Sequence, residues 1–257
     1  MNKIEVAILN NAHESPLGMS LFLAKLTQRG HKLQCMEGLL YMYRECTLFP
    51  TIAARDIVKM PHGTIKRFAP ITIAVVGASR RFLTQARTHQ VGLDYVSASL
   101  QYSDYSNKGS FVVPYEIMTG PALLRQQYLD KCEYDLTFYN RLINEGCCND
   151  TAGYAMNQAL RNILIIQGNH QSWEYFIRTR SCNRNTDETQ YVAARIWEKL
   201  FYESNDGRDM FSNAGPDCLY GKCREGSMSC CNPIKCETPS QLIRKKWPLL
   251  HKEVLPC

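Results

Sequence analysis

The sequence predicts an α+β fold in which a small mixed sheet is accompanied by several long helices. Two short apolar runs, at 4–9 and 70–76, indicate buried strands, and four segments between residues 120 and 204 carry apolar residues at helical spacing. The 257 residues suffice for a sizeable core, and the 45% hydrophobic and 21% charged fractions are ordinary for a globular protein.

The first hundred residues are expected to alternate strands and helices. Ser15 and Pro16 are typical of a helix N-cap and first helical position, and Gly30 is a typical helix end. Gly77 interrupts the second apolar run. The predicted elements are a strand, a helix, a second helical region, a strand and a third helix, at 4–9, 16–30, 39–61, 70–76 and from Ser79 onward.

The second half of the chain is expected to be helical until it changes character near residue 205. The predicted helices cover 120–145, 150–167, 170–180 and 187–204, and their aromatic side chains are expected in the core, notably Trp173, Tyr175, Phe176 and Trp197. The stretch 213–237 is rich in Gly, Pro and Cys and has no periodicity. We therefore divide the chain into a domain at 1–205 and a cysteine-rich appendage at 206–257.

Charge and hydropathy exclude several classes of protein. The formal charge of +6 suits anionic ligands such as nucleotides, but it is too weak and too dispersed to indicate DNA binding. No run approaches 18 apolar residues, so no membrane span is expected. The N-terminus lacks the layout of a signal peptide, and with twelve cysteines this indicates a reducing cytoplasm.

The segment from Ser79 to Ser103 is the most informative part of the sequence. It gathers Arg, His, Gln, Ser and Tyr on a stretch that starts as a helix and ends extended. A solvated helix face seldom needs this mixture, whereas a site that binds a nucleotide and a flavin does. The segment is therefore the first candidate for a functional site.

Motifs in and around this segment resemble those of the flavin-dependent thymidylate synthases, the thymidylate synthase complementing family. Arg180 lies eleven residues after Asn169, as the family pattern requires. The other matching positions, in chain order, are His62-Gly63-Thr64, Gln85, His89, Ser99-Leu100-Gln101-Tyr102 and Asn169-His170-Gln171-Ser172. The resemblance extends over roughly 4–201, and it implies the family's fold.

The resemblance also implies an activity and an assembly. The family makes dTMP from dUMP, with methylenetetrahydrofolate as carbon donor, reduced FAD as hydride donor, NADPH as reductant and no cysteine nucleophile. It assembles each site from several subunits of a homotetramer. Carried over by position, Arg180 and Ser99 are catalytic, His62, Thr64, His89 and Asn169 bind the flavin, and Gln85, Arg87, Ser99 and Arg180 bind the nucleotide.

Several positions depart from the family pattern. Arginines that grip phosphates in the family are replaced at five positions, by Thr88, Gln90, Gln101, Gly153 and Gln171. The nearby cations that can compensate are Arg80, Arg81, Arg87 and Arg161. Two alternatives therefore stay open: an FAD enzyme of the same fold acting on another pyrimidine nucleotide, or a catalytically silent relative that binds nucleotide or metal.

The appendage carries a separate cysteine pattern. Five cysteines fall between residues 218 and 236, among glycines and prolines that favour tight turns. Thiolates within reach of one another in a reducing compartment indicate zinc or an iron–sulfur cluster, although no Cys-x-x-Cys pair is present. The predicted ligands are Cys218, Cys223, Cys230 and Cys236. The alternative is a set of inert thiols.

Overall fold

The computed structural model describes residues 4–11, 15–29, 35–49, 52–59, 63–68, 70–221 and 223–251. Up to residue 97, the elements are β1 (Glu5–Asn11), α1 (Pro16–Arg29), α2 (Met36–Leu48), α3 (Ile52–Lys59), the 3₁₀ helix η2 (Gly63–Phe68), β2 (Pro70–Ser79), α4 (Arg80–Arg87) and β3 (Leu93–Ser97). The remainder are α5 (Tyr115–Thr119), α6 (Ala122–Asn144), α7 (Asn149–Gly153), β4 (Arg161–Asn169), α8 (His170–Arg180), α9 (Asp187–Glu203), α10 (Gly207–Met210), η3 (Asp217–Tyr220), η4 (Gly226–Met228), α11 (Pro239–Lys246) and α12 (Pro248–His251).

The four strands form one sheet in the order β1-β2-β4-β3. The α+β class is confirmed, and each pair in this sheet is antiparallel rather than mixed. The β2–β4 register is shifted between Val76 and Ala78, where Gly77 has a φ of 82°. This glycine permits a backbone conformation that other residues rarely adopt, so it marks a bulge inside the strand instead of ending it.

The helix predicted over 150–167 is wrong. The chain there forms the one-turn helix α7 and then β4, the strand that pairs with both β2 and β3. Alternate residues of β4 are buried, which is the period of a strand. Its run of Ile163 to Ile166 is apolar at every position, and such a run fits a helix and a buried strand equally well by periodicity.

The helical region predicted over 39–61 is two helices, α2 and α3. The sequence has Pro50 between them, at a position outside the described residues. Proline cannot supply the backbone N–H that an uninterrupted helix needs, so two shorter helices form.

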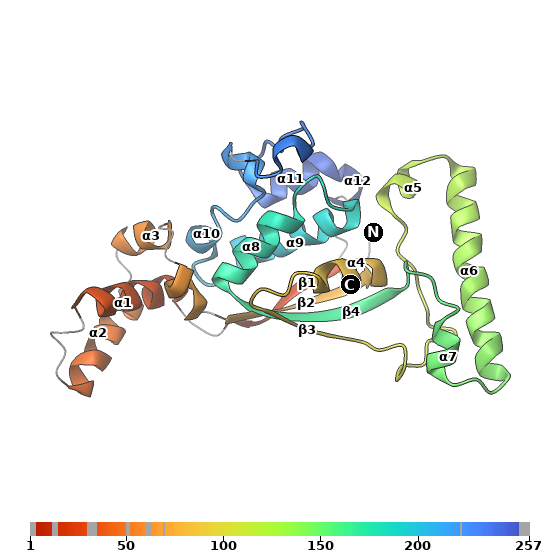
Figure 1. Ribbon diagram of the computed structural model, residues 1–257, viewed down its shortest axis with the longest axis horizontal. Helices are drawn as coiled ribbons and strands as arrows, with labels where there is room; N and C mark the ends of the chain where they lie inside the picture. The colour runs from red at the N-terminus through yellow and green to blue at the C-terminus, as the bar shows by residue number, and fades with distance from the viewer. Residues whose placement is uncertain are drawn as a thin grey trace.

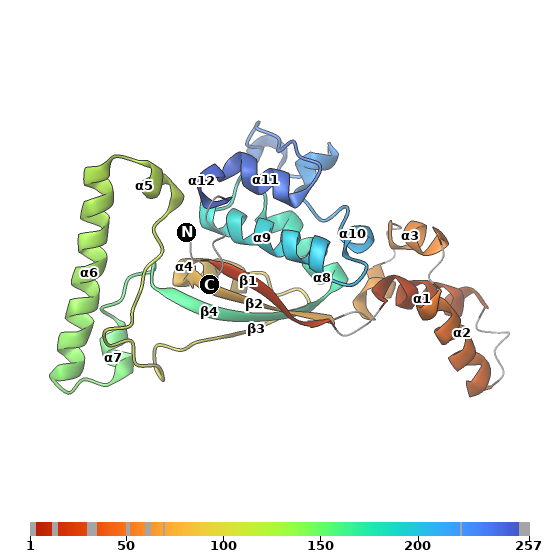
Figure 2. The same cartoon turned by 180° about the vertical axis from the view of Figure 1, so that it is seen from behind.

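Helices α8 and α9 cover one face of the sheet, and α11 and α12 lie beyond them (Figures 1 and 2). Trp173, Phe176 and Trp197 are buried in this layer, as predicted. Tyr175 was expected in the core and is not, since 44% of its surface is exposed. It follows Trp173 by two positions on α8, and this spacing places it on another side of the helix.

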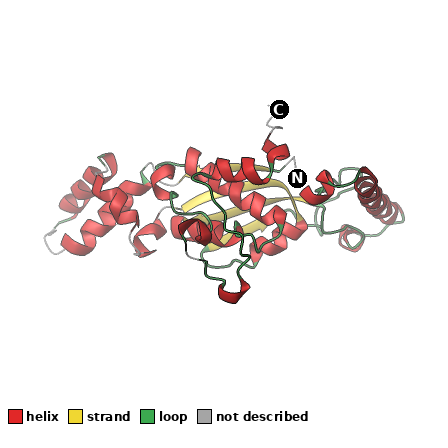
Figure 3. Ribbon diagram, turned by 90° about the horizontal axis from the view of Figure 1, so that it is seen from above, coloured by secondary structure: helices red, strands yellow, loops and turns green. Residues whose placement is uncertain are grey.

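The opposite face of the sheet is open. Figures 1 and 2 show no described helix across it, and Figure 3 shows helices gathered at both ends of the sheet instead. The apolar side chains of Val76, Val96 and Ile163 are 38%, 70% and 47% exposed. A contiguous apolar surface of this kind is typical of a protein–protein contact.

Ser79 joins β2, α4 and α9. Its hydroxyl accepts a hydrogen bond from the N–H of Phe82 (3.0 Å), which caps α4. Its own N–H and hydroxyl donate to the carboxylate of Glu188 on α9. Burial raises the pKa of Glu188, against the lowering effect of these two bonds.

We expect Ser79→Ala to destabilise the fold by about 2 kcal/mol, because one substitution removes a helix cap and a donor to a desolvated carboxyl group. Denaturant unfolding measures the change. Thr84→Ala on the same helix is the matched control, since Thr84 is exposed and bonds only to the carbonyl of Arg80 in its own helix (3.2 Å). An equal effect of the two substitutions would contradict the joining role of Ser79.

Candidate active site

Helices α4 and α8 each begin where a strand ends, and their C-terminal ends meet beside the sheet. Ser79 caps α4 after β2, and Asn169 caps α8 after β4. The Oδ1 atom of Asn169 accepts from the N–H and the hydroxyl of Ser172, both at 3.0 Å. Gly92, with a φ of 68°, lies against this cap, because an added Cβ there would be 2.2 Å from Ser172 Oγ. The two strand–helix junctions therefore fix the backbone around the site.

His89 is buried where the two helices meet. Its ring contacts Tyr175 and Phe176 of α8, at centroid distances of 4.7 and 5.4 Å. Burial, and then the charge of Arg180, lower the pKa of His89 to about 4, so the ring is neutral at pH 7. Its Nε2 atom is buried without a hydrogen-bond partner within the described residues.

Arg180 lies at the end of α8, over the end of α4. Its Nη2 donates to Thr88 Oγ1 (2.7 Å) and its Nη1 to Asn185 Oδ1 (3.4 Å). Burial lowers the pKa of Arg180, although Tyr95 and Tyr175 raise it. Its Nε is buried and has no partner in the described part of the chain. The guanidinium is therefore oriented by two polar contacts and keeps donor capacity for a ligand.

Gln85 and Arg87 belong to the same end of α4. Gln85 is half-buried and its carbonyl accepts from Thr88 Oγ1 (2.8 Å). Arg87 is exposed and donates to Ser97 Oγ on β3 (2.7 Å). Both residues are thus near the Arg180 contact along the chain, on the helix that carries Thr88.

Ser99 lines a different space. A cavity of about 450 Å³ includes Arg80, Ser99, Gln101 and Gly153 in its lining, and it includes neither Arg180 nor His89. The Nη1 atom of Arg80 is buried without a partner in the described chain. Within one chain, the predicted catalytic pair Ser99 and Arg180 is therefore divided between two places.

The other cations proposed as replacements differ in their surroundings. Arg161 donates to the carbonyls of Phe111 (3.2 Å) and Gly77 (2.9 Å), which makes it a structural residue. Arg81 is exposed on α4. Arg80 is the candidate that lines a cavity together with the departures Gln101 and Gly153.

The predicted flavin residues before β2 are only partly described. His62 lies outside the described residues, and Thr64 belongs to η2, with its side chain outside the description. Helix η2 is attached to α8 by a nearly buried ion pair between Lys66 and Glu174 (3.0 Å). Next to it, Arg67 Nε donates to Gln171 Oε1 (2.9 Å), which brings a cation to a position where the family has arginine.

His170 supports the base of α8. Its ring packs on Phe211, its Nε2 donates to the carbonyl of Met210, and its Nδ1 is buried without a partner in the described chain. Burial lowers its pKa to about 4. In the unfolded chain the same imidazole titrates near 6.5. As pH falls from about 6.5 towards 4, the imidazole binds a proton in the unfolded state but not in the native state. The free energy of unfolding therefore decreases over this pH window.

We therefore expect the stability of the wild-type protein to fall more than that of His170→Gln between pH 7 and pH 5. Urea unfolding of both proteins at the two pH values measures the difference. Because His89 is present in both, its contribution cancels. Equal losses in the two proteins would show that His170 is not the titrating group.

The predicted ligands in the tail do not all line one cavity. Cys218, Cys223 and Cys230 line one, together with Cys182 from the end of α8, whereas Cys236 lines another with Cys218. The eleven described cysteines are free thiols. As placed, the described His, Cys, Asp and Glu side chains include no group of three that could hold a metal ion. The predicted set Cys218, Cys223, Cys230 and Cys236 is thus not gathered at one point.

Comparison with known proteins identifies the family of the chain. The family profile described as "Thymidylate synthase complementing protein" matches residues 51–203, which is 153 of the 257 residues. The chain belongs to this family. Among relatives, the flavin-dependent thymidylate synthase of Geobacter sulfurreducens is 26% identical over 175 residues, 68% of this chain and 73% of the relative. That of Pyrococcus furiosus is 26% identical over 212 residues, 77% and 83% of the two chains.

Solved structures show the family fold. Thymidylate synthase X of Helicobacter pylori, in complex with FAD and dUMP, has a TM-score of 0.59 at 16% identity, over 82% of this chain and 98% of that one. The UMP/dUMP methylase PolB of Streptomyces cacaoi, bound to 5-bromo-dUMP, has a TM-score of 0.62 at 14% identity, over 81% and 94%.

Among the described residues, no helix is long and apolar enough to cross a membrane.

Sequence reasoning missed three residues of the site. Thr88, noted only as a departure from the family's arginine, is the hydroxyl that Arg180 contacts. Tyr175 was assigned to the core, yet it lies against His89 and remains partly exposed. Arg67 was not considered, although a basic residue just before β2 is visible in the sequence and could have been tested against Gln171.

Proposed function

We propose that this member of the thymidylate synthase complementing family is an FAD-dependent thymidylate synthase that methylates dUMP to dTMP. The observation that carries the proposal is the meeting of α4 and α8. There a neutral, buried His89 and a positioned Arg180 each keep a buried nitrogen without a partner among the described residues. A buried polar atom without a hydrogen bond lowers the stability of the fold, and a bound ligand that pairs with it removes this cost.

The donors beside this meeting and at the N-terminus of α8 fit a flavin dinucleotide, which is anionic and rich in hydrogen-bond acceptors. His89 offers Nε2, and Asn169 offers its amide N–H groups because its Oδ1 is occupied by the helix cap. Thr64 and His62 belong to the same proposed flavin site. When bound and reduced by NADPH, the flavin supplies the hydride, and the protein has only to bind, orient and polarise.

The nucleotide needs cations for its phosphate and for its pyrimidine. We propose that Arg180 lies along the pyrimidine edge and stabilises negative charge there, and that Gln85 and Arg87 contact the nucleotide. Ser99 and Arg80 belong to the phosphate end, where Arg80 takes over the charge that Gln101 and Gly153 lack. The buried, unpartnered Nη1 of Arg80 supports this assignment.

We propose that each site joins two chains, and the separate places of Ser99 and Arg180 in one chain support this. We propose a homotetramer. The open face of the sheet, with exposed Val76, Val96 and Ile163, supports a large contact between subunits. The carbon would come from methylenetetrahydrofolate: a C–C bond forms between that carbon and C5 of the pyrimidine, and the C5 proton leaves. The bond between the carbon and the folate nitrogen breaks, tetrahydrofolate leaves, and the hydride that the reduced flavin would supply makes the added group a methyl.

The assay that tests the proposal is tritium release from 5-tritiated dUMP with FAD, NADPH and methylenetetrahydrofolate. We expect release to depend on all three additions, and the protein to bind FAD. Arg80→Gln should raise the KM for dUMP roughly tenfold or more while FAD binding is kept, since it removes one phosphate contact. Flavin binding without release from any pyrimidine nucleotide would instead indicate a catalytically silent relative.

UMP is the alternative substrate. The loss of arginines at Gln101 and Gly153 favours a changed nucleotide preference, and the structural similarity to a UMP/dUMP methylase is consistent with it. Tritium release from labelled UMP under the same conditions decides between the two. Faster release from UMP than from dUMP would overturn dUMP as the main substrate.

The family match ends at residue 203, which supports our division into a catalytic domain at 1–205 and an appendage at 206–257. Free cysteines are consistent with the cytoplasm that we propose as its location.

A further inference from the structure

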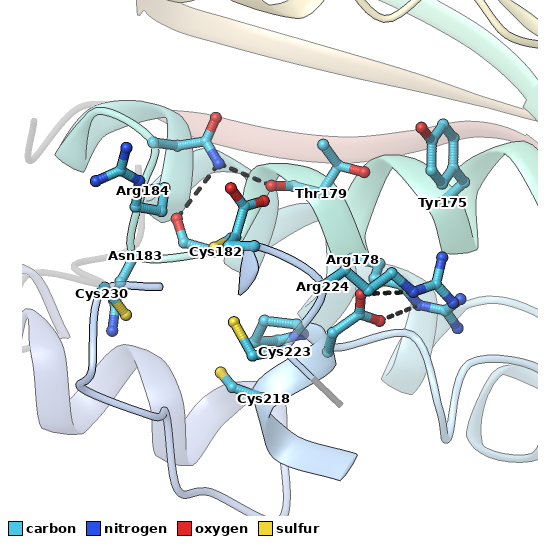
Figure 4. A pocket seen from close by; sticks show the side chains of 14 residues that line it. Tyr175, Arg178, Thr179, Cys182, Asn183, Arg184, Cys218, Cys223, Arg224 and Cys230 are labelled. Carbon is cyan, nitrogen blue, oxygen red and sulfur yellow. Dashed lines mark hydrogen bonds and ion pairs between the residues drawn. The ribbon is translucent and has the colours of Figure 1, made fainter. Parts of the chain in front are cut away.

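Four cysteines from separate segments converge on one cavity beneath α8. The cavity measures about 360 Å³ and is lined by Cys182, Cys218, Cys223 and Cys230. Cys182 follows the end of α8, Cys218 belongs to η3, Cys223 follows it, and Cys230 follows η4 (Figure 4). The neighbouring Cys231 and the sixth cysteine of this region, Cys236, do not line it.

We infer that these four cysteines form a structural Zn²⁺ site, with Cys182 in place of Cys236 as the fourth ligand. Four thiolates are the ligand set that Zn²⁺ takes in closed, tetrahedral structural sites. The inference does not depend on the activity proposed above, because three of the four ligands lie beyond the residues that match the family profile.

The surroundings suit the charge of such a site. A zinc ion with four thiolates carries two negative charges, and the cavity lining has three arginines against two carboxylates. Asp217 holds two of them in place, at 3.3 Å from Arg178 and 3.1 Å from Arg224. The backbone N–H of Ile234 already donates to the sulfur of Cys218 (3.3 Å), as second-shell donors do in thiolate sites.

To bind one zinc ion, the four cysteine sulfur atoms must move closer together. As placed, no three of the described ligand-type side chains reach one ion, since Zn–S bonds are about 2.3 Å long. Between Cys218 and Cys230 the chain forms only the short 3₁₀ helices η3 and η4, with positive φ at Gly221 and Gly226. This stretch has few apolar residues and cannot form a hydrophobic core of its own. The free energy of metal binding would therefore stabilise its folded conformation.

The site would tie the appendage to the end of α8. Cys182 is two residues from Arg180, and Asn183 next to it donates to the carbonyl of Asn232 (2.8 Å) in the appendage. A bound ion would therefore fix the C-terminal end of the helix that carries Arg180. Its role is structural, since none of the four cysteines contacts the proposed flavin or nucleotide residues in any described hydrogen bond.

Metal analysis of the full-length chain, purified without chelators and under reducing conditions, tests the inference. We expect about one zinc per chain. Reduced apoprotein should bind Co²⁺ with the thiolate charge-transfer and visible bands of a tetrahedral site. Cys182→Ser and Cys223→Ser should each weaken zinc affinity by roughly tenfold or more, whereas the matched controls Cys231→Ser and Cys236→Ser should keep it.

Circular dichroism spectra of the variants and the wild-type protein are compared as a control, and we expect them to be the same, so that a loss of zinc is not due to unfolding. Substoichiometric zinc together with no Co²⁺ binding would overturn the site, as would an iron–sulfur absorption spectrum or a disulfide among the four cysteines. Zinc loss in Cys236→Ser but not in Cys182→Ser would overturn the ligand set.

Discussion

Arg180→Lys is expected to lower kcat/KM for dUMP on the order of a hundredfold, about 2.7 kcal/mol in transition-state stabilisation. Lysine keeps the charge but has one nitrogen, so it cannot contact Thr88 and Asn185 while it also presents a donor to the pyrimidine. FAD binding and the unfolding midpoint should change little, because the substituted group lies at the end of α8. Steady-state kinetics with the tritium-release assay give the measurement.

Arg55→Lys is the matched control for Arg180→Lys. Arg55 also donates to an oxygen, Asp209 Oδ2 (3.0 Å), but in an exposed ion pair on α3. Its replacement should leave kcat/KM unchanged. Thr88→Val tests the positioning of Arg180, and we expect about a tenfold loss that Thr88→Ser restores. An Arg180→Lys enzyme with wild-type kinetics would remove Arg180 from the mechanism.

The largest stability effect is expected for Trp197→Ala, at about 3–5 kcal/mol. Trp197 is 1% exposed on α9, and its indole N–H donates to the carbonyl of Phe211 (3.0 Å). The ring also packs against Gly215, where an added Cβ would approach it to 2.7 Å. The substitution therefore empties a space between α9 and the start of the appendage and leaves a buried carbonyl without its donor.

Denaturant unfolding compares Trp197→Ala with Tyr202→Ala on the same helix. Tyr202 is 41% exposed, and its ring has a cation–π contact with Arg208 and an edge contact with Phe201 (4.9 Å between centroids). These contacts are at the surface, so its loss should cost about 1 kcal/mol. If the two variants were equally stable, Trp197 would not anchor the core of α9.

The sequence predicted the fold class and most helices, because their apolar positions repeat at the helical period. Helices α1, α4, α6, α8 and α9 all fall within the predicted regions. Strand β4 was misassigned because its four consecutive apolar residues have no period that distinguishes a central strand from a helix. The choice was made by tertiary structure, since β4 has partners on both sides in β2 and β3.

Several members of the candidate site were predictable, but their grouping was not. Family spacing placed His89, Asn169 and Arg180 in one region. In the structure His89 packs on Tyr175 of α8 and Arg180 bonds to Thr88 at the end of α4, so both lie where these helices meet. No spacing could show that Ser99 and Arg80 line another cavity, or that Arg80 keeps a buried nitrogen without a partner in the described chain while Arg161 is bonded to two carbonyls. Those facts depend on which neighbours each side chain finds after folding.

If two chains share each site, as we propose, the separation of Ser99 and Arg80 from Arg180 has a genetic consequence. In an oligomer of Arg180→Lys chains every shared site contains one substituted residue, Lys at position 180. In an oligomer of Arg80→Gln chains every shared site likewise contains one substituted residue. When the two are expressed together and assemble at random, some sites receive both sound residues and others receive neither. Mixed oligomers should then sustain growth on thymidine-free medium in cells that neither defective allele supports alone.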